Sequence, residues 1–246
     1  MPSKSSPDGT IPSVVRALVR LHGDIAPPPP RSAFEWVLWE NIAYLANDER
    51  RADAFALLSR EVGTEPKAIL RASAATLRNV AAHGILAERS TAKLVDAART
   101  VIDEFGGSLD GVLDEPPRDA IRALRRLPGI GEPAAEKILL FAGGQSWLAP
   151  DSNALRVLCC VGLVDERPSY AATYAAARRR AEAEIEGGVA AYQRAHLALR
   201  RHGQLVCTRT KPACGRCPLA VTCRHAPTVL TVTPPPARAG CRTGKA

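Results

Sequence analysis

One stretch constrains the fold of this chain more than any other: Leu-Pro-Gly-Ile-Gly-Glu-Pro-Ala-Ala-Glu-Lys-Ile-Leu, from Leu127 to Leu139. Its pattern is typical of the end of one helix, a tight turn and the start of a second helix. Gly129 and Gly131 allow backbone angles and close approaches that other residues resist. A helix that starts here directs unpaired N–H groups at whatever lies in front of it, which favours a phosphate. The stretch therefore predicts a helical hairpin whose turn can bind a phosphate.

The composition predicts an all-α protein. Alanine, leucine and arginine are abundant, whereas aromatic residues make up only 4% of the 246 residues. Such a chain favours helices over strands. Its length is enough for one large domain or two smaller ones.

Charge and targeting signals restrict the compartment and the partner. The formal net charge is +8, from 33 basic and 25 acidic residues. This charge suits a polyanion such as nucleic acid, although a general preference for arginine would explain it equally well. The polar start of the chain does not resemble a signal peptide, and no apolar run is long enough to span a bilayer. We therefore expect a cytoplasmic protein with reduced cysteines.

The order of helical patterns predicts the organisation of the chain. Residues 1–11 are polar and are expected to be disordered, and residues 226–246, which include Cys241, are expected to form a flexible tail. A proline-rich connector spans 26–31. Ser32 and Glu35 have the spacing of a capping box, so we expect a helix from there through Leu45. Other helices are expected at about 11–22, 49–62, 65–72, 74–82, 90–105, 118–126, 151–164, 170–186 and 188–202, and residues 137–141 are expected to continue the second helix of the hairpin.

Two carboxylates stand out along this chain. Glu40 lies in an almost wholly apolar helical stretch, where a carboxylate is costly unless it is paired, protonated or functional. A buried ion pair or a solvent-facing position is the simpler interpretation of Glu40. Asp151 lies where a loop meets a helix, and an ordinary helix N-cap is its simpler interpretation.

The cysteines carry the most specific signal. Four of them have the spacing Cys207-x6-Cys214-x2-Cys217-x5-Cys223. Four thiolates from one short segment can ligate a [4Fe–4S] cluster, and zinc is the alternative metal. Zinc sites usually present two close cysteine pairs and this segment has one, so the spacing favours the cluster. The adjacent Cys159 and Cys160 are interpreted as core residues.

Three motifs in this order resemble one family. They are Leu127-Pro-Gly-Ile-Gly131, Pro150-Asp-Ser-Asn153, and His202-Gly-Gln-Leu-Val followed by the cysteine segment. Together they are similar to the endonuclease III/MutY superfamily of helix-hairpin-helix (HhH-GPD) DNA glycosylases, and the resemblance covers about residues 32–223. It implies base-excision repair, with a damaged base of duplex DNA flipped into a cleft between two helical lobes.

The resemblance also implies lobe boundaries and site residues. One lobe would be 32–148, and the other would join 12–31 to 149–225, with a [4Fe–4S] cluster in 207–223. Asp151 would be catalytic, either stabilising positive charge on the sugar or positioning the nucleophile. Backbone N–H groups would bind a DNA phosphate at Gly129, Ile130 and Gly131. Ile85 would insert into the duplex, and the protein would act as a monomer.

The chain departs from the family where bifunctional members carry a lysine, two residues after the second hairpin glycine. That lysine attacks the sugar, forms a Schiff base and permits strand cleavage. Here the position is Pro133, so we expect a monofunctional enzyme that uses water. A bifunctional glycosylase/AP lyase with another amine, such as Lys137, is the alternative. A DNA-binding protein that recognises lesions without catalysis is a second one.

The first helix resembles MutY-type members more closely. Phe34-Glu-Trp-Val-Leu-Trp-Glu40 is similar to the segment that ends in their catalytic glutamate, which protonates the departing base. In an apolar setting Glu40 would keep its proton near neutral pH. Asn153 matches an asparagine of that group, and Tyr44 is expected in the substrate pocket, although a core position is equally consistent. The glutamine-rich stretch that follows the MutY glutamate is replaced here by Asn41-Ile-Ala-Tyr-Leu45.

Overall fold

A computed structural model describes residues 9–226, and this part of the chain is helical without strands. The all-α prediction is confirmed. The expected disordered start and flexible tail, including Cys241, fall largely outside the described residues. No helix between residues 9 and 226 is both long and apolar enough to cross a membrane. The helices are α1 (Ile11–His22), α2 (Ala33–Ile42), α3 (Asp48–Glu61), α4 (Pro66–Arg71), α5 (Ala74–Ala81), α6 (Ala87–Phe105), α7 (Asp110–Leu113), α8 (Pro117–Leu124), α9 (Glu132–Phe141), α10 (Ser152–Cys160), α11 (Tyr170–Glu184), α12 (Gly188–Leu205) and a 3₁₀ turn η1 (Cys214–Arg216).

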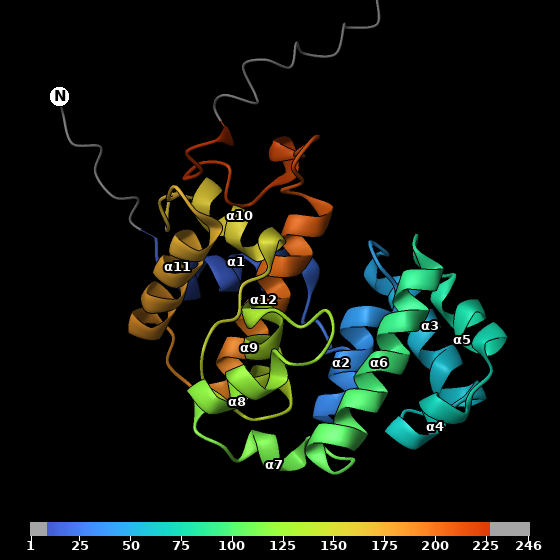
Figure 1. Cartoon of the computed structure of the whole chain (residues 1–246). Helices are drawn as coiled ribbons and strands as arrows, with labels where there is room; N and C mark the ends of the chain where they lie inside the picture. The colour runs from blue at the N-terminus through green and yellow to red at the C-terminus, as the bar shows by residue number, and fades with distance from the viewer. Residues whose placement is uncertain (1–8, 227–246) are drawn as a thin grey trace, which may run out of the picture.

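The helices form two groups that meet at α9. Helices α2, α4 and α5 pack against α6, whereas α1 and α10 pack against α12 (Figure 1). The first helix therefore lies among the last ones. Helix α9 contacts both α2 and α12, so the second helix of the hairpin joins the two groups. The residue boundaries of two lobes stay a prediction.

Helix α2 is buried on nearly all sides. Its start is a capping box, in which the Glu35 backbone N–H donates to Ser32 Oγ and the Ser32 N–H donates to the Glu35 carboxylate, as predicted. Trp36 stacks on Phe141 of α9, with ring centroids 4.9 Å apart, and Trp39 meets Phe55 of α3 edge to face. Burial of such large aromatic side chains fixes α2 between the two groups.

The expected extension of this helix to Leu45 is wrong, because α2 ends at Ile42. A second loop approaches too closely for the helix to continue. A Cβ atom on Gly84 would lie 2.6 Å from the Tyr44 backbone nitrogen, and the Ile85 N–H donates to the Tyr44 carbonyl at 3.1 Å. Leu45 then adopts a left-handed conformation with φ of 55°, which is uncommon outside glycine.

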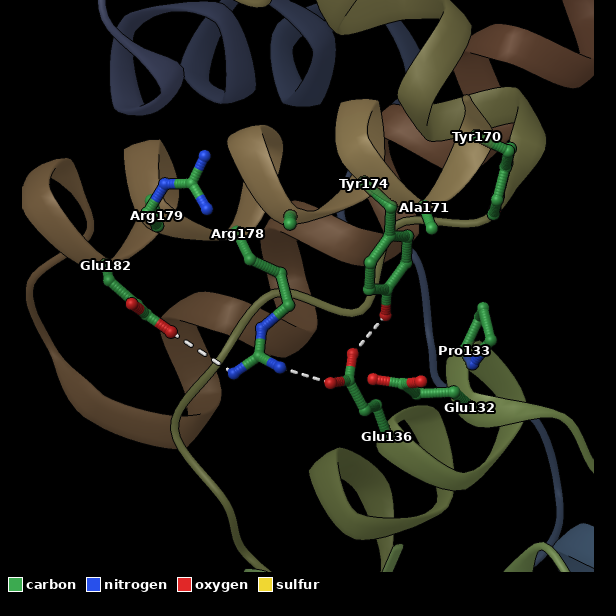
Figure 2. A pocket seen from close by; sticks show the side chains of 10 residues that line it. Glu132, Pro133, Glu136, Tyr170, Ala171, Tyr174, Arg178, Arg179 and Glu182 are labelled. Atoms are coloured by element: carbon green, nitrogen blue, oxygen red, sulfur yellow. Dashed lines mark hydrogen bonds and ion pairs between the residues drawn. The ribbon is translucent and has the colours of Figure 1, made fainter. Parts of the chain in front are cut away.

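A buried carboxylate ties α9 to α11. The Glu136 side chain is fully buried and accepts hydrogen bonds from the Tyr174 hydroxyl and the Arg178 guanidinium (Figure 2). Arg178 also lies over the Trp147 ring, 5.0 Å from its centroid. Burial raises the pKa of Glu136 above its ordinary value, although Tyr174 and Arg178 oppose the rise. The junction of α9 and α11 thus depends on one charged pair beside a pocket of about 360 Å³.

Arg178→Met should lower the free energy of unfolding by about 3 kcal/mol at pH 7, because it leaves the buried Glu136 without its charged partner. The raised pKa of Glu136 means that the folded state favours the protonated carboxyl, so stability falls as pH rises above 4.5. The cost of the substitution should therefore shrink toward pH 4.5. Urea unfolding at pH 7 and at pH 4.5 measures this change in the free energy of unfolding. Arg179→Met, at an exposed neighbour in the same pocket, is the control and should cost under about 0.5 kcal/mol. An equal cost of Arg178→Met at both pH values would contradict the role of Glu136.

Candidate functional site

The hairpin turn is held in place by a side chain of α2. Gly129 has φ of 75°, in the left-handed region. The Asn41 amide nitrogen donates to the Pro128 carbonyl at 2.9 Å and to the Val37 carbonyl at 3.0 Å. A Cβ atom on Gly129 would lie only 2.2 Å from Asn41 Oδ1. The turn therefore needs glycine for two reasons, its backbone angle and the contact with Asn41.

The turn uses one of its three predicted phosphate-binding amides internally. The Ile130 N–H donates to the Leu127 carbonyl at 3.2 Å, and the Ile130 side chain is buried. Among the described residues, the backbone N–H groups of Gly129 and Gly131, which lie outside the helices, donate to no backbone carbonyl. Gly131 is the N-cap of α9. The amides available to a phosphate are thus those of Gly129, Gly131 and the first turn of α9.

Glu40 lies in an ion pair rather than in an apolar setting. Its carboxylate Oε1 is 2.8 Å from Nζ of Lys137 on α9, and both side chains are only 14% exposed. Burial by itself would raise the pKa of Glu40, but the charges of Lys137 and Arg51 outweigh burial and hold the pKa below its ordinary value. The expectation of a protonated Glu40 near neutral pH is therefore wrong, because two cations from other helices face it.

Asp151 is an N-cap and an ion-pair partner at the same time. Its Oδ1 accepts hydrogen bonds from the backbone N–H groups of Asn153 and Ala154, which caps α10. Its Oδ2 lies 2.5 Å from the Arg200 guanidinium of α12. Burial alone would raise the pKa of Asp151, but Arg200 and the other favourable contacts lower it to about 2. Both carboxylate oxygens are thus held, and the side chain carries a negative charge at neutral pH.

Arg200 and Lys137 bring the two carboxylates into one region. Arg200 also pairs with Asp48, the first residue of α3, and so links α3 to α12. Arg200, Asp48 and Lys137 line the same small pocket with Trp36, Trp39 and His196. The His196 ring is buried, its Nδ1 lies 2.8 Å from the Ala149 carbonyl oxygen, and burial lowers its pKa to about 4. Sequence reasoning missed Arg200, because nothing in the local pattern distinguishes it from surface arginines.

Two predicted site residues lie elsewhere. The Tyr44 side chain is 48% exposed and the Ile85 side chain is 58% exposed, and the backbones of their two loops are joined by the hydrogen bond from the Ile85 N–H to the Tyr44 carbonyl. The Asn153 amide oxygen accepts from Arg156 at 2.9 Å, and Arg156 also donates to the carbonyls of Gly203 and Cys207. Asn153 therefore lies against the last turns of α12, at Gly203. A role of Tyr44 or Asn153 in a substrate pocket stays a prediction.

The four motif cysteines line one cavity. Cys207, Cys214, Cys217 and Cys223 surround it, and Val206, Pro212 and Ala220 add an apolar wall. All six cysteines in residues 9–226 are free thiols. The His202 ring nitrogen lies 3.3 Å from Cys217 Sγ. No three Cys, His, Asp or Glu side chains among the described residues are arranged to hold a single metal ion. Four thiols around one shielded cavity form a donor set that fits an iron–sulfur cluster.

Cys159 and Cys160 lie in different surroundings, although both were expected to be core residues. Cys159 packs against the hydrophobic core. Cys160 lines the cysteine cavity instead, and its backbone carbonyl accepts a hydrogen bond from Cys223 Sγ at 3.2 Å. The core interpretation of Cys160 is therefore wrong. The residues are one step apart on a helix, so their side chains point about 100° away from each other.

The sequence is similar to adenine DNA glycosylases. No family model matches the chain. The human adenine DNA glycosylase is 31% identical over 136 residues, which are 54% of this chain and 22% of the human protein. The mouse protein is 30% identical over 136 residues, 54% of this chain and 24% of that protein. The chain thus spans less than a quarter of the length of these relatives.

Solved structures share the fold. A trapped endonuclease III–DNA covalent intermediate matches with a TM-score of 0.70 at 17% identity, covering 89% of this chain and 97% of the other. A thermostable thymine-DNA glycosylase matches with a TM-score of 0.68 at 17% identity, covering 89% and 97%. The fold and hairpin define a helix-hairpin-helix protein. The chain thus shares the fold of endonuclease III and is similar in sequence to adenine DNA glycosylases, in agreement with the resemblance that the motifs indicated.

Gly129→Ala should destabilise the protein by about 3 kcal/mol, because a left-handed alanine costs about 1–2 kcal/mol and the clash with Asn41 adds at least as much. Gly106→Ala is the matched control. Gly106 has φ of 65° but open space around its Cβ position, so only the backbone cost of about 1 kcal/mol applies. Urea unfolding of both variants measures the difference. Equal losses would show that Asn41 does not restrict the turn.

Arg200→Gln should cost about 3 kcal/mol of unfolding free energy at pH 7, because it leaves Asp151 buried without its charged partner. The pKa of Asp151 should rise from about 2, since burial is then opposed more weakly. The wild-type pair stabilises the fold above pH 3.8 and is lost as pH falls through about 2. In the variant the carboxyl takes up its proton at higher pH, so the cost should be smaller at pH 4. Carbon-13 NMR titration of Asp151 measures its pKa, and Arg201→Gln serves as the control. An Asp151 pKa that stays at about 2 in Arg200→Gln would refute the pairing.

Proposed function

We propose that this protein is a DNA N-glycosylase that hydrolyses the N-glycosidic bond of a damaged or mispaired base in duplex DNA. The observation that carries the proposal is the position of Asp151. Its ionised carboxylate is fixed at the start of α10 and shares a buried region with Glu40 and Lys137. The superfamily fold and the adenine DNA glycosylase relatives support the same conclusion.

Asp151 suits the electrostatic part of this reaction. As the glycosidic bond breaks, positive charge develops on the sugar ring. A carboxylate that stays ionised and cannot rotate stabilises that charge without first reorganising. Arg200 and the two backbone N–H groups hold Asp151 in this way. DNA would bind through its phosphates at the hairpin amides, which do not read sequence.

Glu40 and Lys137 suit the proton transfers. The ionised Glu40 can accept a proton from the attacking water, whereas the ammonium of Lys137, 2.8 Å away, is the nearest acid for the departing base. This assignment revises the expectation that Glu40 itself protonates the base, because its lowered pKa keeps it ionised. The exposed side chains of Ile85 and Tyr44, on two loops joined by a backbone hydrogen bond, would fill the space in the duplex that the flipped base leaves.

A second candidate is a bifunctional glycosylase/AP lyase, and the buried amine of Lys137 is the observation that favours it. Such an amine would attack sugar C1′ as the base leaves, and the resulting Schiff base would permit strand cleavage. The ion pair with Glu40 argues against it, because an ammonium has no lone pair for attack. Pro133, at the position of the family lysine, has no amine at all.

The four motif cysteines would hold the [4Fe–4S] cluster. Cys207, Cys214, Cys217 and Cys223 are the ligands we propose. When bound, such a cluster cross-links the loop after α12 and supplies a redox-active centre. No step of base removal depends on it.

A panel of duplexes, each with one lesion or mismatch, tests the function. Products are scored with and without alkali and after borohydride reduction. We expect abasic product that breaks only with alkali, and no covalent adduct. Asp151→Asn and Glu40→Gln should each lower the rate at least about 100-fold. Asp103→Asn, at an exposed position on α6, is the matched control and should leave it unchanged.

Three outcomes contradict parts of this proposal. An adduct that Lys137→Gln abolishes would favour the lyase. Tight binding without base release from any duplex would favour a non-catalytic lesion-binding protein. Full activity in both carboxylate variants would overturn the site assignment.

A further inference from the structure

Two histidines form a chain of contacts that ends on one of the motif cysteines. His202, near the end of α12, is buried, and its Nε2 lies 3.3 Å from Cys217 Sγ. Its Nδ1 lies 3.1 Å from Nε2 of His22, the last residue of α1. The two rings meet edge to face, with centroids 5.4 Å apart. Both ring nitrogens of His202 therefore have partners, one on the cysteine loop and one 180 positions earlier in the chain.

Packing and backbone contacts fix this arrangement. Helix α1 packs against α12, which places His22 beside His202. The His202 carbonyl accepts the backbone N–H groups of Val206 and Cys207, each at 2.9 Å. The same residue thus holds the backbone of one motif cysteine and contacts the sulfur of another with its ring.

Metal binding defines the direction of these hydrogen bonds. A cysteine that ligates iron is deprotonated, so the Cys217 sulfur can only accept. Nε2 of His202 then carries the proton and donates. In a neutral imidazole the other nitrogen is an acceptor, so Nδ1 of His202 accepts from Nε2 of His22. The contact with His22 thereby selects the tautomer of His202 that the ligand sulfur needs.

Such a chain acts on the cluster rather than on base removal. Hydrogen bonds to cluster sulfurs are among the features that set the reduction potential. A donor places positive charge near the sulfur and so favours the reduced state, which is more negative. The burial of His202 strengthens this effect, because a hydrogen bond is stronger at low dielectric. Neighbouring hydrogen bonds polarise one another, so His22 contributes through His202.

We propose that His202 donates a hydrogen bond to the Cys217 ligand, that His22 holds His202 in the tautomer that donates, and that the pair raises the reduction potential of the cluster. His22 is a positioning residue, because it acts through His202. The proposal rests on the proposed iron–sulfur cofactor. It does not depend on glycosylase activity, because no base-removal step involves the cluster.

Holoprotein variants at both histidines test the proposal. His202→Phe removes the donor to Cys217, and His202→Gln supplies an amide N–H in its place. His22→Phe removes the partner of His202, and His22→Gln supplies a donor again. His83→Phe, at a histidine between α5 and α6, is the control. Iron and sulfide content and the absorbance near ~410 nm report whether the cluster is present. Voltammetry and an EPR-monitored redox titration report its potential.

All variants should keep the cluster. The potential should become more negative in His202→Phe and, by a smaller amount, in His22→Phe. It should return toward wild type in both glutamine variants and stay unchanged in His83→Phe. His22→Phe keeps the proposal testable if His202→Phe does not fold, because His22 lies one hydrogen bond farther from the cysteine.

Several results would overturn the proposal. An unchanged potential in His202→Phe would show that the hydrogen bond has no effect on the cluster. A shift in His202→Phe without any shift in His22→Phe would remove the role of His22. Glutamine variants that match the phenylalanine variants would show that the donor is not what matters. Holoprotein that contains only zinc would remove the cluster altogether. Base-release assays on the same preparations test the proposed function separately, because an intact cluster without base release contradicts only the glycosylase.

Discussion

Two adjacent polar residues on a buried helix, Glu40 and Asn41, are the constraint on which the rest of the site depends. A buried carboxylate and a buried amide are each costly unless they are paired. Asn41 satisfies its amide on the hairpin turn, and Glu40 satisfies its charge on Lys137. Both partners belong to the hairpin turn or the helix that follows it. The apolar surface of α2 supplies most of the packing, but these two contacts determine how the hairpin sits against it.

Two other buried carboxylates of the molecule are also paired. Asp151 is paired with Arg200, and Glu136 with Arg178 and Tyr174. Each group joins helices that are far apart in the chain. The consequence differs from site to site, because the balance between burial and nearby charge differs. The pKa of Asp151 and of Glu40 is lowered, whereas that of Glu136 is raised. Carboxyl groups that look alike in sequence therefore have opposite proton affinities, and the two with lowered pKa are those we propose for catalysis.

Helix α10 connects the two chemical parts of the protein. Its first residues are capped by Asp151, and its last residue, Cys160, lines the cavity of the motif cysteines. Between them Arg156 binds the carbonyls of Gly203 and Cys207. The helix therefore places the proposed catalytic carboxylate and the proposed cluster at its opposite ends. Such an arrangement makes the loop after α12 a support for Asp151, whatever redox role the cluster has.

The sequence by itself determined the helical class, the hairpin, the Ser32 capping box and the similarity to DNA glycosylases, because each depends on motifs whose residues are close together in the chain. Residue spacing was also enough to bring four cysteines to one loop. It did not determine the end of α2, which the backbone of Gly84 terminates by contact. It could not predict the ionised Glu40, the pairing of Arg200 or the orientation of Cys160. The ionisation of a buried group depends on charges that other helices bring within a few ångströms, as Lys137 does for Glu40, and only the tertiary structure decides which charges those are.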